Sequence, residues 1–249
     1  MRGKDLGSRT KSTLSLSWPR QKYQVNMKFK DRASAGARLA AYLEPYANTG
    51  AVVFAIPNGG IPVGIQIANA LNARLELMIT RRINFPFTTE SGFGAITADG
   101  HAIIDDRLAT QHGITKSEID RMKQEALNRI DEKLTLFGVQ RQAPDVTCKV
   151  VIICDDGIAG GFSMRASIAS IAGMRPSMII VAVPTAPSSS LEKIKPLVHE
   201  IVCPIIGRGY SFAVADAYEH WYDISDSEAK MLWNNFAPYR IMGSENENQ

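Results

Sequence analysis

The stretch Val150-Val151-Ile152-Ile153-Cys154-Asp155-Asp156-Gly157-Ile158-Ala159-Gly160-Gly161-Phe162-Ser163 decides which fold this sequence can adopt. It begins with an apolar run that is long enough for a strand buried on both faces. Two acidic residues and a glycine-rich turn follow, and the next apolar residues have helical spacing. Strands that are apolar throughout are typical of parallel sheets covered by helices. The stretch therefore predicts a strand, a turn and a helix of an α/β protein.

Strand-like and helix-like segments alternate on both sides of this stretch. Short apolar runs predict strands over 51–56, 75–79, 149–154, 177–183 and 200–204. Helical spacing predicts a helix capped by Asp31, helices over 61–71, 119–137 and 163–173, and a closing helix over 222–233 capped by Ser225 or Asp226. We therefore predict an open, mainly parallel, twisted sheet with helices on both faces and a small hood.

Composition limits the class of protein. The chain has 249 residues, 45% of them hydrophobic, which is enough for a large core and excludes disorder of the whole chain. Its three cysteines, Cys148, Cys154 and Cys203, have no CxxC spacing, so a disulfide framework or a zinc site is not expected. No apolar run reaches the roughly 18 residues that a membrane span needs. We expect a cytoplasmic protein with no membrane partner.

Positive charge is concentrated near the N-terminus. The formal net charge is +3, and residues 1–30 hold eight basic residues against one acidic residue. We interpret 1–28 as a basic arm, 29–236 as the folded domain and 237–249 as a C-terminal tail. The arm lacks dense basic runs, so a solvated tail is the simpler interpretation, and a nucleic-acid-binding arm is the alternative. Residues 13–18 alternate polar and apolar side chains, which is compatible with a short edge strand.

Acidic residues and glycines follow the strand at 149–154. In parallel sheets, ligands bind beyond the carboxyl ends of the strands. Asp155 and Asp156 can accept hydrogen bonds from hydroxyls or bind a metal, and the glycine-rich turn can offer backbone N–H groups and a helix dipole to a phosphate. Ser163 adds a hydroxyl donor. Because a sugar phosphate carries both kinds of group, we predict that ligand class.

Better-known glycine-rich motifs do not fit this turn. It lacks the GxGxxG spacing, and its acidic residues precede the glycines, so a dinucleotide site is poorly supported. It lacks the Gly-Lys-Ser/Thr of a Walker loop, and 161–165 lacks the second glycine of a serine-hydrolase nucleophile elbow. An ordinary turn with an aspartate cap remains as the simple alternative, although it leaves the second aspartate and the glycine pair unexplained.

The residues quoted above resemble the signature of the type I phosphoribosyltransferases, which is an apolar strand, two acidic residues and a phosphate loop. Further blocks are similar to those of a poorly characterised bacterial and archaeal branch of that family. They are 29–32 with 35–36, 56–60, 81–82, 90 with 94–96, 181–184 and 212–214. The resemblance covers roughly 29–233, and it implies the type I phosphoribosyltransferase fold.

The resemblance also implies an activity. A phosphoribosyltransferase moves a 5-phosphoribosyl group from phosphoribosyl pyrophosphate, with Mg²⁺, to a nitrogen nucleophile such as a nucleobase and releases pyrophosphate. Asp155 and Asp156 are the implied catalytic residues: they hold the ribose hydroxyls and, directly or through water, the metal. A homodimer is the implied assembly.

The same resemblance distributes the phosphates over two loops. The 5′-phosphate is expected on Gly157, Ile158, Ala159, Gly160, Gly161, Phe162 and Ser163. The pyrophosphate is expected on Asn58, Gly59 and Gly60, with Arg81 and Arg82 at the end of the next strand. A solvated strand end is the alternative interpretation of that arginine pair.

Two departures from the branch and one further position bear on activity. The branch usually carries Arg where Asn58 stands and Thr where Gly160 stands, so one pyrophosphate cation and one phosphate hydroxyl are missing. Transferases for hypoxanthine and guanine place an acidic residue at the position of Ala159, which argues against a 6-oxopurine acceptor.

Acceptor-binding elements are expected to cover the site. The polar, glycine-containing segment 85–100 is interpreted as a closing flap, and 206–221 as a hood in which Phe212, Tyr218 and Trp221 stack on a planar acceptor. The alternative is that these aromatic side chains belong to the core. Three functions stay open: an active transferase, a phosphoribosyl-pyrophosphate-binding regulator that uses the basic arm on nucleic acid, and a phosphate-binding scaffold without turnover. The sequence does not identify the acceptor or a general acid or base.

Overall fold

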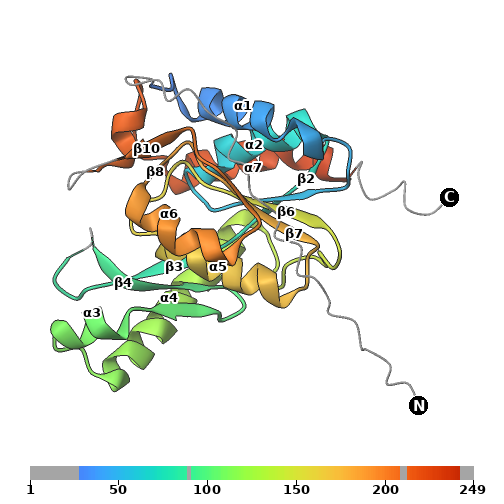
Figure 1. Ribbon diagram of the computed structural model, residues 1–249. Helices are drawn as coiled ribbons and strands as arrows, with labels where there is room; N and C mark the ends of the chain where they lie inside the picture. The colour runs from blue at the N-terminus through green and yellow to red at the C-terminus, as the bar shows by residue number, and fades with distance from the viewer. Residues whose placement is uncertain (1–27, 89–90, 208–211, 242–249) are drawn as a thin grey trace, which may run out of the picture.

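A computed structural model describes residues 28–88, 91–207 and 212–241, with side chains described up to residue 236 in the last helix. A five-stranded sheet with the order β2-β1-β6-β7-β9 forms the centre (Figure 1). All four strand pairings in this sheet are parallel. The strands are β1 (Val52–Ala55), β2 (Arg74–Leu77), β6 (Val150–Cys154), β7 (Met178–Ala182) and β9 (Glu200–Val202). The predicted α/β class with a mainly parallel sheet is confirmed.

Helices cover both faces of this sheet, and the strands alternate between two cores. Val53 and Ala55 of β1 point into one core, and Val52 and Phe54 point into the other. Residues of α1 (Arg32–Tyr42), α2 (Gly60–Leu71), α4 (Lys116–Phe137) and α7 (Asp226–Ile241) fill the first core. Those of α5 (Phe162–Gly173) and α6 (Ser188–Ile194) fill the second. Burial on both faces explains why β1, β6 and β7 are apolar throughout, whereas the edge strands β2 and β9 carry Arg74, Glu76 and Glu200.

A second, antiparallel sheet projects from the parallel one, and the sequence analysis did not predict it. It has the order β3-β4-β5, formed by β3 (Thr80–Asn84), β4 (Gly92–Thr97) and β5 (Ala102–Ile104). The helix α4 packs on β3 and β4, and α3 (Asp106–Gln111) contacts β4 (Figure 1). Much of the segment 85–100, interpreted above as a flap, is therefore a buried strand: Phe93 and Ala95 are fully buried. Among the described residues of this segment, those before β4 and the turn after it at 98–100 have the expected loop character.

Further short elements complete the fold, and two of them follow the carboxyl ends of β7 and β9. Two short parallel strands, β8 (Thr185–Pro187) and β10 (Ile205–Gly207), pair with each other. The segment after η3 (Val214–Ala217) returns to the start of the domain, where Tyr218 forms a β-bridge with Phe29. Two further 3-10 turns are η1 (Glu44–Tyr46) and η2 (Lys195–Leu197). Part of the predicted hood, 208–211, and the basic arm lie outside the described residues.

Capping groups define the helices that carry site residues. Asp31 begins α1 with a capping box in which its carboxylate accepts from the Ser34 N–H. Ser225 begins α7, since its hydroxyl accepts from the Glu228 N–H at 3.2 Å. Among the described residues, no helix combines the length and the apolarity needed to cross a membrane.

Candidate functional site

An acidic pair stands at the carboxyl end of β6. Asp155 and Asp156 directly follow the strand, and the Asp155 carboxylate accepts a hydrogen bond from the Asp156 N–H at 2.8 Å. The Asp156 side chain is only 15% exposed. Adjacent, largely buried carboxylates are costly for a fold, so their presence indicates a binding role.

Arg32 reaches the acidic pair from the first turn of α1. Its Nε donates to Asp156 Oδ2 at 2.7 Å, and Nη1 donates to the Tyr222 carbonyl at 2.8 Å. The guanidinium carbon lies 4.0 Å from the ring centre of Trp221. Only 7% of the Arg32 side chain is exposed. The sequence analysis gave no role to this arginine, although it lies in one of the family-like blocks, because its partner is 124 residues away.

Burial dominates the protonation of the pair. Desolvation raises the pKa of Asp155 well above its usual range, and the neighbouring charge of Asp156 raises it further. Desolvation also raises the pKa of Asp156, but there the Arg32 guanidinium opposes the shift. Because Arg32 lies against Asp156, the pKa of Asp155 is the more strongly raised of the two.

The glycine-rich loop presents backbone N–H groups at the start of α5. Among the described residues, the N–H groups from Ala159 to Ser163 donate no hydrogen bond, as is usual for a helix N-terminus. Gly161 has φ of +76°, which favours glycine. The loop lines a cavity of about 220 Å³ together with Asp155, Arg82, Ser91 and Gly92. This arrangement can bind a phosphate next to a sugar hydroxyl.

A second loop, Pro57-Asn58-Gly59-Gly60, follows β1 and lies against the acidic pair. A Cβ on Gly59 would stand 1.9 Å from Asp156 Oδ2, and one on Gly60 would stand 3.0 Å from the Cys154 carbonyl. Position 59 therefore requires glycine for steric reasons, and a Cβ at position 60 would crowd the backbone after β6. The peptide bond between Pro57 and Asn58 is cis. The two loops that the sequence analysis selected thus meet at one place, although they lie far apart in the sequence.

The Asn58 side chain turns toward α4 and α7. Its Nδ2 donates to the Ile224 carbonyl at 2.9 Å and to Asp226 Oδ1 at 2.8 Å. Its Oδ1 accepts from Lys133 Nζ at 2.9 Å. The side-chain donors of Asn58 are therefore used within the protein, and contact with a ligand at this position would fall to the backbone.

These observations can be set beside known proteins. Residues 29–217, about three quarters of the chain, match the family described as phosphoribosyl transferase domain. The chain belongs to the phosphoribosyl transferase family. The whole parallel sheet, the acidic pair and the glycine-rich loop described above lie within the matched residues.

Relatives of this phosphoribosyl transferase chain include proteins of two strains of Mycobacterium tuberculosis that are provisionally named as phosphoribosyl transferases. Each is 28% identical over 200 residues, which make up 80% of this chain and 45% of the relative. The chain therefore spans less than half the length of these relatives. A similar solved structure is TT1426 from Thermus thermophilus, with a TM-score of 0.68 and 25% identity. The match covers 84% of this chain and 99% of that one.

The two arginines predicted for the pyrophosphate lie in the middle of β3, not at the end of a strand of the parallel sheet. Arg81 pairs with Ile96 and Arg82 with Ala95 in the antiparallel sheet. Neighbouring residues of a strand point to opposite faces, so the side chains of Arg81 and Arg82 lie on different faces of the antiparallel sheet. Arg82 lines the cavity of the glycine-rich loop. Arg81 lies close enough to Asp226 to lower the pKa of that carboxyl, as Lys133 and Asn58 do more strongly.

The three aromatic side chains predicted to stack on the acceptor lie in different environments. Tyr218 is 3% exposed, and its hydroxyl donates to the Asp156 carbonyl at 2.6 Å, so it supports the acidic turn from within the core. This structural role replaces the expected stacking role of Tyr218. Trp221 is partly exposed and lies over Arg32. Phe212 is partly exposed and packs on Gly207, where a Cβ would stand 2.2 Å from its ring.

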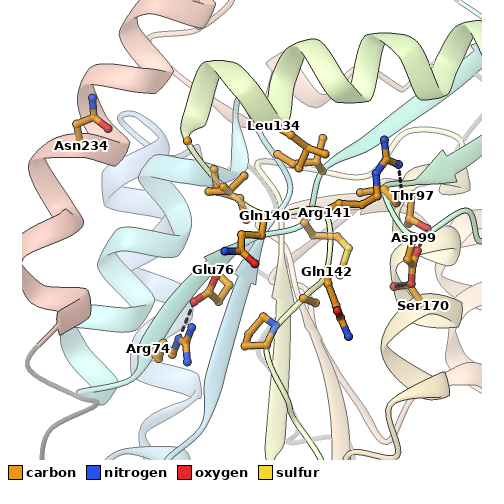
Figure 2. Close-up of a pocket in the computed structure, with 18 residues that line it drawn as sticks. Arg74, Glu76, Thr97, Asp99, Leu134, Gln140, Arg141, Gln142, Ser170 and Asn234 are labelled. Atoms are coloured by element: carbon orange, nitrogen blue, oxygen red, sulfur yellow. Dashed lines mark hydrogen bonds and ion pairs between the residues drawn. The ribbon is translucent and has the colours of Figure 1, made fainter.

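A larger cavity of about 990 Å³ lies apart from this site (Figure 2). It is bounded by the edge strand β2, the segment 138–144 and the turn at Asp99, whose carboxylate accepts from the Ser170 hydroxyl at 2.7 Å. None of the residues predicted to bind the ligand lines it. Size alone therefore does not select this cavity as the candidate site, because the acidic pair and the glycine-containing loops come together elsewhere.

Proposed function

We propose that this chain transfers a 5-phosphoribosyl group from phosphoribosyl pyrophosphate to a nitrogen nucleophile. The observation that supports this most is the contact between the loop at Gly59 and the carboxylate of Asp156. With a glycine-containing loop on each side, the acidic pair suits a sugar that carries a phosphate at C5 and a pyrophosphate at C1. In the reaction, the bond from C1 to the pyrophosphate oxygen breaks, the pyrophosphate leaves with the electron pair, and a C1–N bond forms. The nitrogen releases its proton to solvent or to the leaving group.

The acidic pair has two tasks in this proposal. Carboxylate oxygens of Asp155 and Asp156 accept hydrogen bonds from the ribose hydroxyls and so fix the sugar. Their negative charge also favours the positive charge that develops at C1 as the pyrophosphate departs. Arg32 and the Tyr218 hydroxyl act as positioning groups, because they hold the Asp156 carboxylate and carbonyl.

The phosphates bind mainly to backbone. The open N–H groups from Ala159 to Ser163 hold the 5′-phosphate, and Arg82 adds a charge at the edge of the same cavity. In this proposal the pyrophosphate contacts the backbone at 58 and 59, because the Gly60 N–H already donates to the Ile56 carbonyl at 3.0 Å.

The site fits Mg²⁺ only together with its substrate. Among the described residues, no three His, Cys, Asp or Glu side chains come together as a metal site. Mg²⁺ commonly takes one or two carboxylates and completes its shell with water and substrate phosphates. Asp155 and Asp156 supply that number, and the bound metal would neutralise charge on the leaving pyrophosphate.

The acceptor approaches from the side of Trp221 and of the turn before β4. The Ala159 position offers no acid to a base, which argues against hypoxanthine or guanine as acceptor. Trp221 is the aromatic side chain best placed to stack on a planar acceptor, because it already lies over Arg32 beside the acidic pair. We also propose a homodimer, as in the resemblance, which light scattering during size-exclusion chromatography tests.

The decisive experiment is release of pyrophosphate from phosphoribosyl pyrophosphate and Mg²⁺ with a panel of nucleobases and related heterocycles. Asp155→Asn serves as the matched control, because asparagine keeps the size and the hydrogen bond to the Asp156 N–H. Acceptor-dependent release that is lost in the control supports the proposal. Absence of ligand binding by calorimetry would overturn it.

A second candidate is a protein that binds phosphoribosyl pyrophosphate without turnover. The internal use of both Asn58 donors favours it, because the loop then offers the pyrophosphate no side-chain donor of its own. Tight binding without acceptor-dependent release would select this function. Nucleic-acid binding that disappears on deletion of 1–28 would add the regulatory role suggested by the basic arm.

A further inference from the structure

A polar cluster of Lys133, Asn58 and Asp226 lies on the outer side of the pyrophosphate loop. Lys133 belongs to the last turns of α4 and extends its ammonium group to Asn58 Oδ1 at 2.9 Å and to Asp226 Oδ1 at 2.6 Å. Three separate elements therefore bring their side chains to one point: the loop after β1, α4 and the first turn of α7.

The charges of the cluster itself balance, and Arg81 adds a second cation nearby. Lys133 and Arg81 are cationic, and Asp226 is the anion that lies against Lys133, with Arg81 near enough to act on it. The Lys133 side chain is 23% exposed and that of Asp226 is 55% exposed, so both can be reached from solvent. Lys133 can change partners, because its ammonium group is carried on a flexible four-carbon stem.

We propose that Lys133 supplies the pyrophosphate-binding cation in this chain, and that Asp226 holds its ammonium group until the ligand replaces that carboxylate. This inference rests on the proposed function. It follows from two findings: Asn58 offers no cation from the loop, and a lysine from another element stands one hydrogen bond away from it.

The competing explanation is that the cluster is purely structural. The two explanations predict opposite effects on ligand affinity when the charge of Asp226 is removed. If Lys133, Asn58 and Asp226 only connect α4 and α7 to the loop, removing either charge loosens the loop, and both changes weaken binding. If Asp226 competes with the ligand for Lys133, removing the lysine weakens binding whereas removing the carboxylate strengthens it. Asp226→Asn keeps an oxygen that can accept from Asn58, so it isolates the charge.

The experiment measures calorimetric affinity for phosphoribosyl pyrophosphate, inorganic pyrophosphate and ribose 5-phosphate, each with Mg²⁺ at low ionic strength. Lys133→Met is expected to weaken the two pyrophosphate-containing ligands about tenfold or more, as loss of a charge-assisted hydrogen bond does. Ribose 5-phosphate, which lacks the pyrophosphate, should bind as before. Lys133→Arg should retain most of the affinity, and Asp226→Asn should tighten the same two ligands.

Lys123→Met is the matched control, because Lys123 lies on the same helix ten residues earlier, about 15 Å along its axis. It should change no affinity. Thermal unfolding of each variant shows that the fold is kept. Equal affinities in wild type and Lys133→Met, or weaker binding in Asp226→Asn, would overturn the inference while leaving the proposed function standing. A wild-type protein that binds none of the three ligands would overturn the proposed function, and the inference with it.

Discussion

Arg32 Nε lies 2.7 Å from Asp156 Oδ2, and this ion pair joins the first turn of α1 to the turn that follows β6. Both side chains are largely buried, and the same arginine also bonds the Tyr222 carbonyl and lies on Trp221. Burying two charges is favourable only when further hydrogen bonds satisfy them, as they do here. The pair thus holds the acidic turn and the segment before α7 in one arrangement.

Arg32→Lys should lower both stability and ligand affinity. Lysine cannot donate in two directions while stacking on an indole, so we expect a loss of about 1–3 kcal/mol in the free energy of unfolding. Denaturant unfolding of the two single variants and of Arg32→Lys with Asp156→Asn should show coupling of about 0.5–3 kcal/mol. Arg129→Lys, in an exposed ion pair with Glu132, is the control and should change stability by less than about 1 kcal/mol. Additive single effects would contradict the role of the pair.

Asp155→Asn should stabilise the metal-free protein at neutral pH. The pKa of Asp155 is raised in the folded state, so this group binds more protons when folded, and its stabilising contribution is lost as pH rises through the raised pKa. Asparagine does not ionise, so the variant avoids this loss of stability at higher pH, and its side-chain oxygen still accepts from the Asp156 N–H. Thermal unfolding with a chelator should therefore show a gain that is larger at pH 7 to 8 than near pH 4. A gain that does not depend on pH would contradict this assignment.

Gly160→Thr should tighten binding of the 5′-phosphate. A Cβ at this position would meet only the Phe162 ring, at 3.6 Å, which is an ordinary van der Waals distance, and φ is not in the left-handed region. The threonine hydroxyl then adds one donor to the phosphate loop, and each 1.4 kcal/mol of added binding free energy would tighten binding about tenfold. Ribose 5-phosphate titrations measure it, with Gly160→Ala as the variant that adds the Cβ without the hydroxyl. Weaker binding would show that this loop holds a different ligand.

Gly59→Ala should abolish binding, because the new Cβ would stand 1.9 Å from Asp156 Oδ2 and must displace the loop or the carboxylate. Gly160→Ala is the control, because a Cβ at that position meets no close atom. Titration with phosphoribosyl pyrophosphate should show binding in the second variant and none in the first. Retained affinity in Gly59→Ala would mean that the two loops do not need their present contact.

The three inner strands of the parallel sheet, β1, β6 and β7, could be predicted from sequence because they are apolar on both faces and leave a continuous signal. The apolar run 150–154 also located the acidic pair and the glycine-rich loop, because these residues directly follow it. The antiparallel sheet was not predicted, since β3 carries Thr80, Arg81 and Arg82 on one short strand and β5 has only three residues. Short, mixed strands depend on neighbours such as α4, and local patterns do not show these neighbours.

Side chains that act across the fold were also beyond the sequence. Arg32 and Asp156 are 124 residues apart, and Lys133 and Asp226 are 93 residues apart. Each is an ordinary charged residue on a helix or turn until the topology brings the partners together. The internal use of Asn58 was hidden in the same way. An asparagine in a loop indicates a turn, and nothing nearby in the chain identifies its partners.

The contact between Gly59 and Asp156 has a consequence for laboratory evolution. The backbone of Gly59 lies against the carboxylate of Asp156 and leaves no room for a side chain. Random libraries that mutate positions 59, 60, 155 or 156 should therefore consist mainly of inactive variants. Diversity directed at Trp221, Phe212 and the turn before β4 leaves this contact untouched. Selection for new acceptors should therefore recover variants at those positions, and the ribose-holding part of the site should return unchanged from every round.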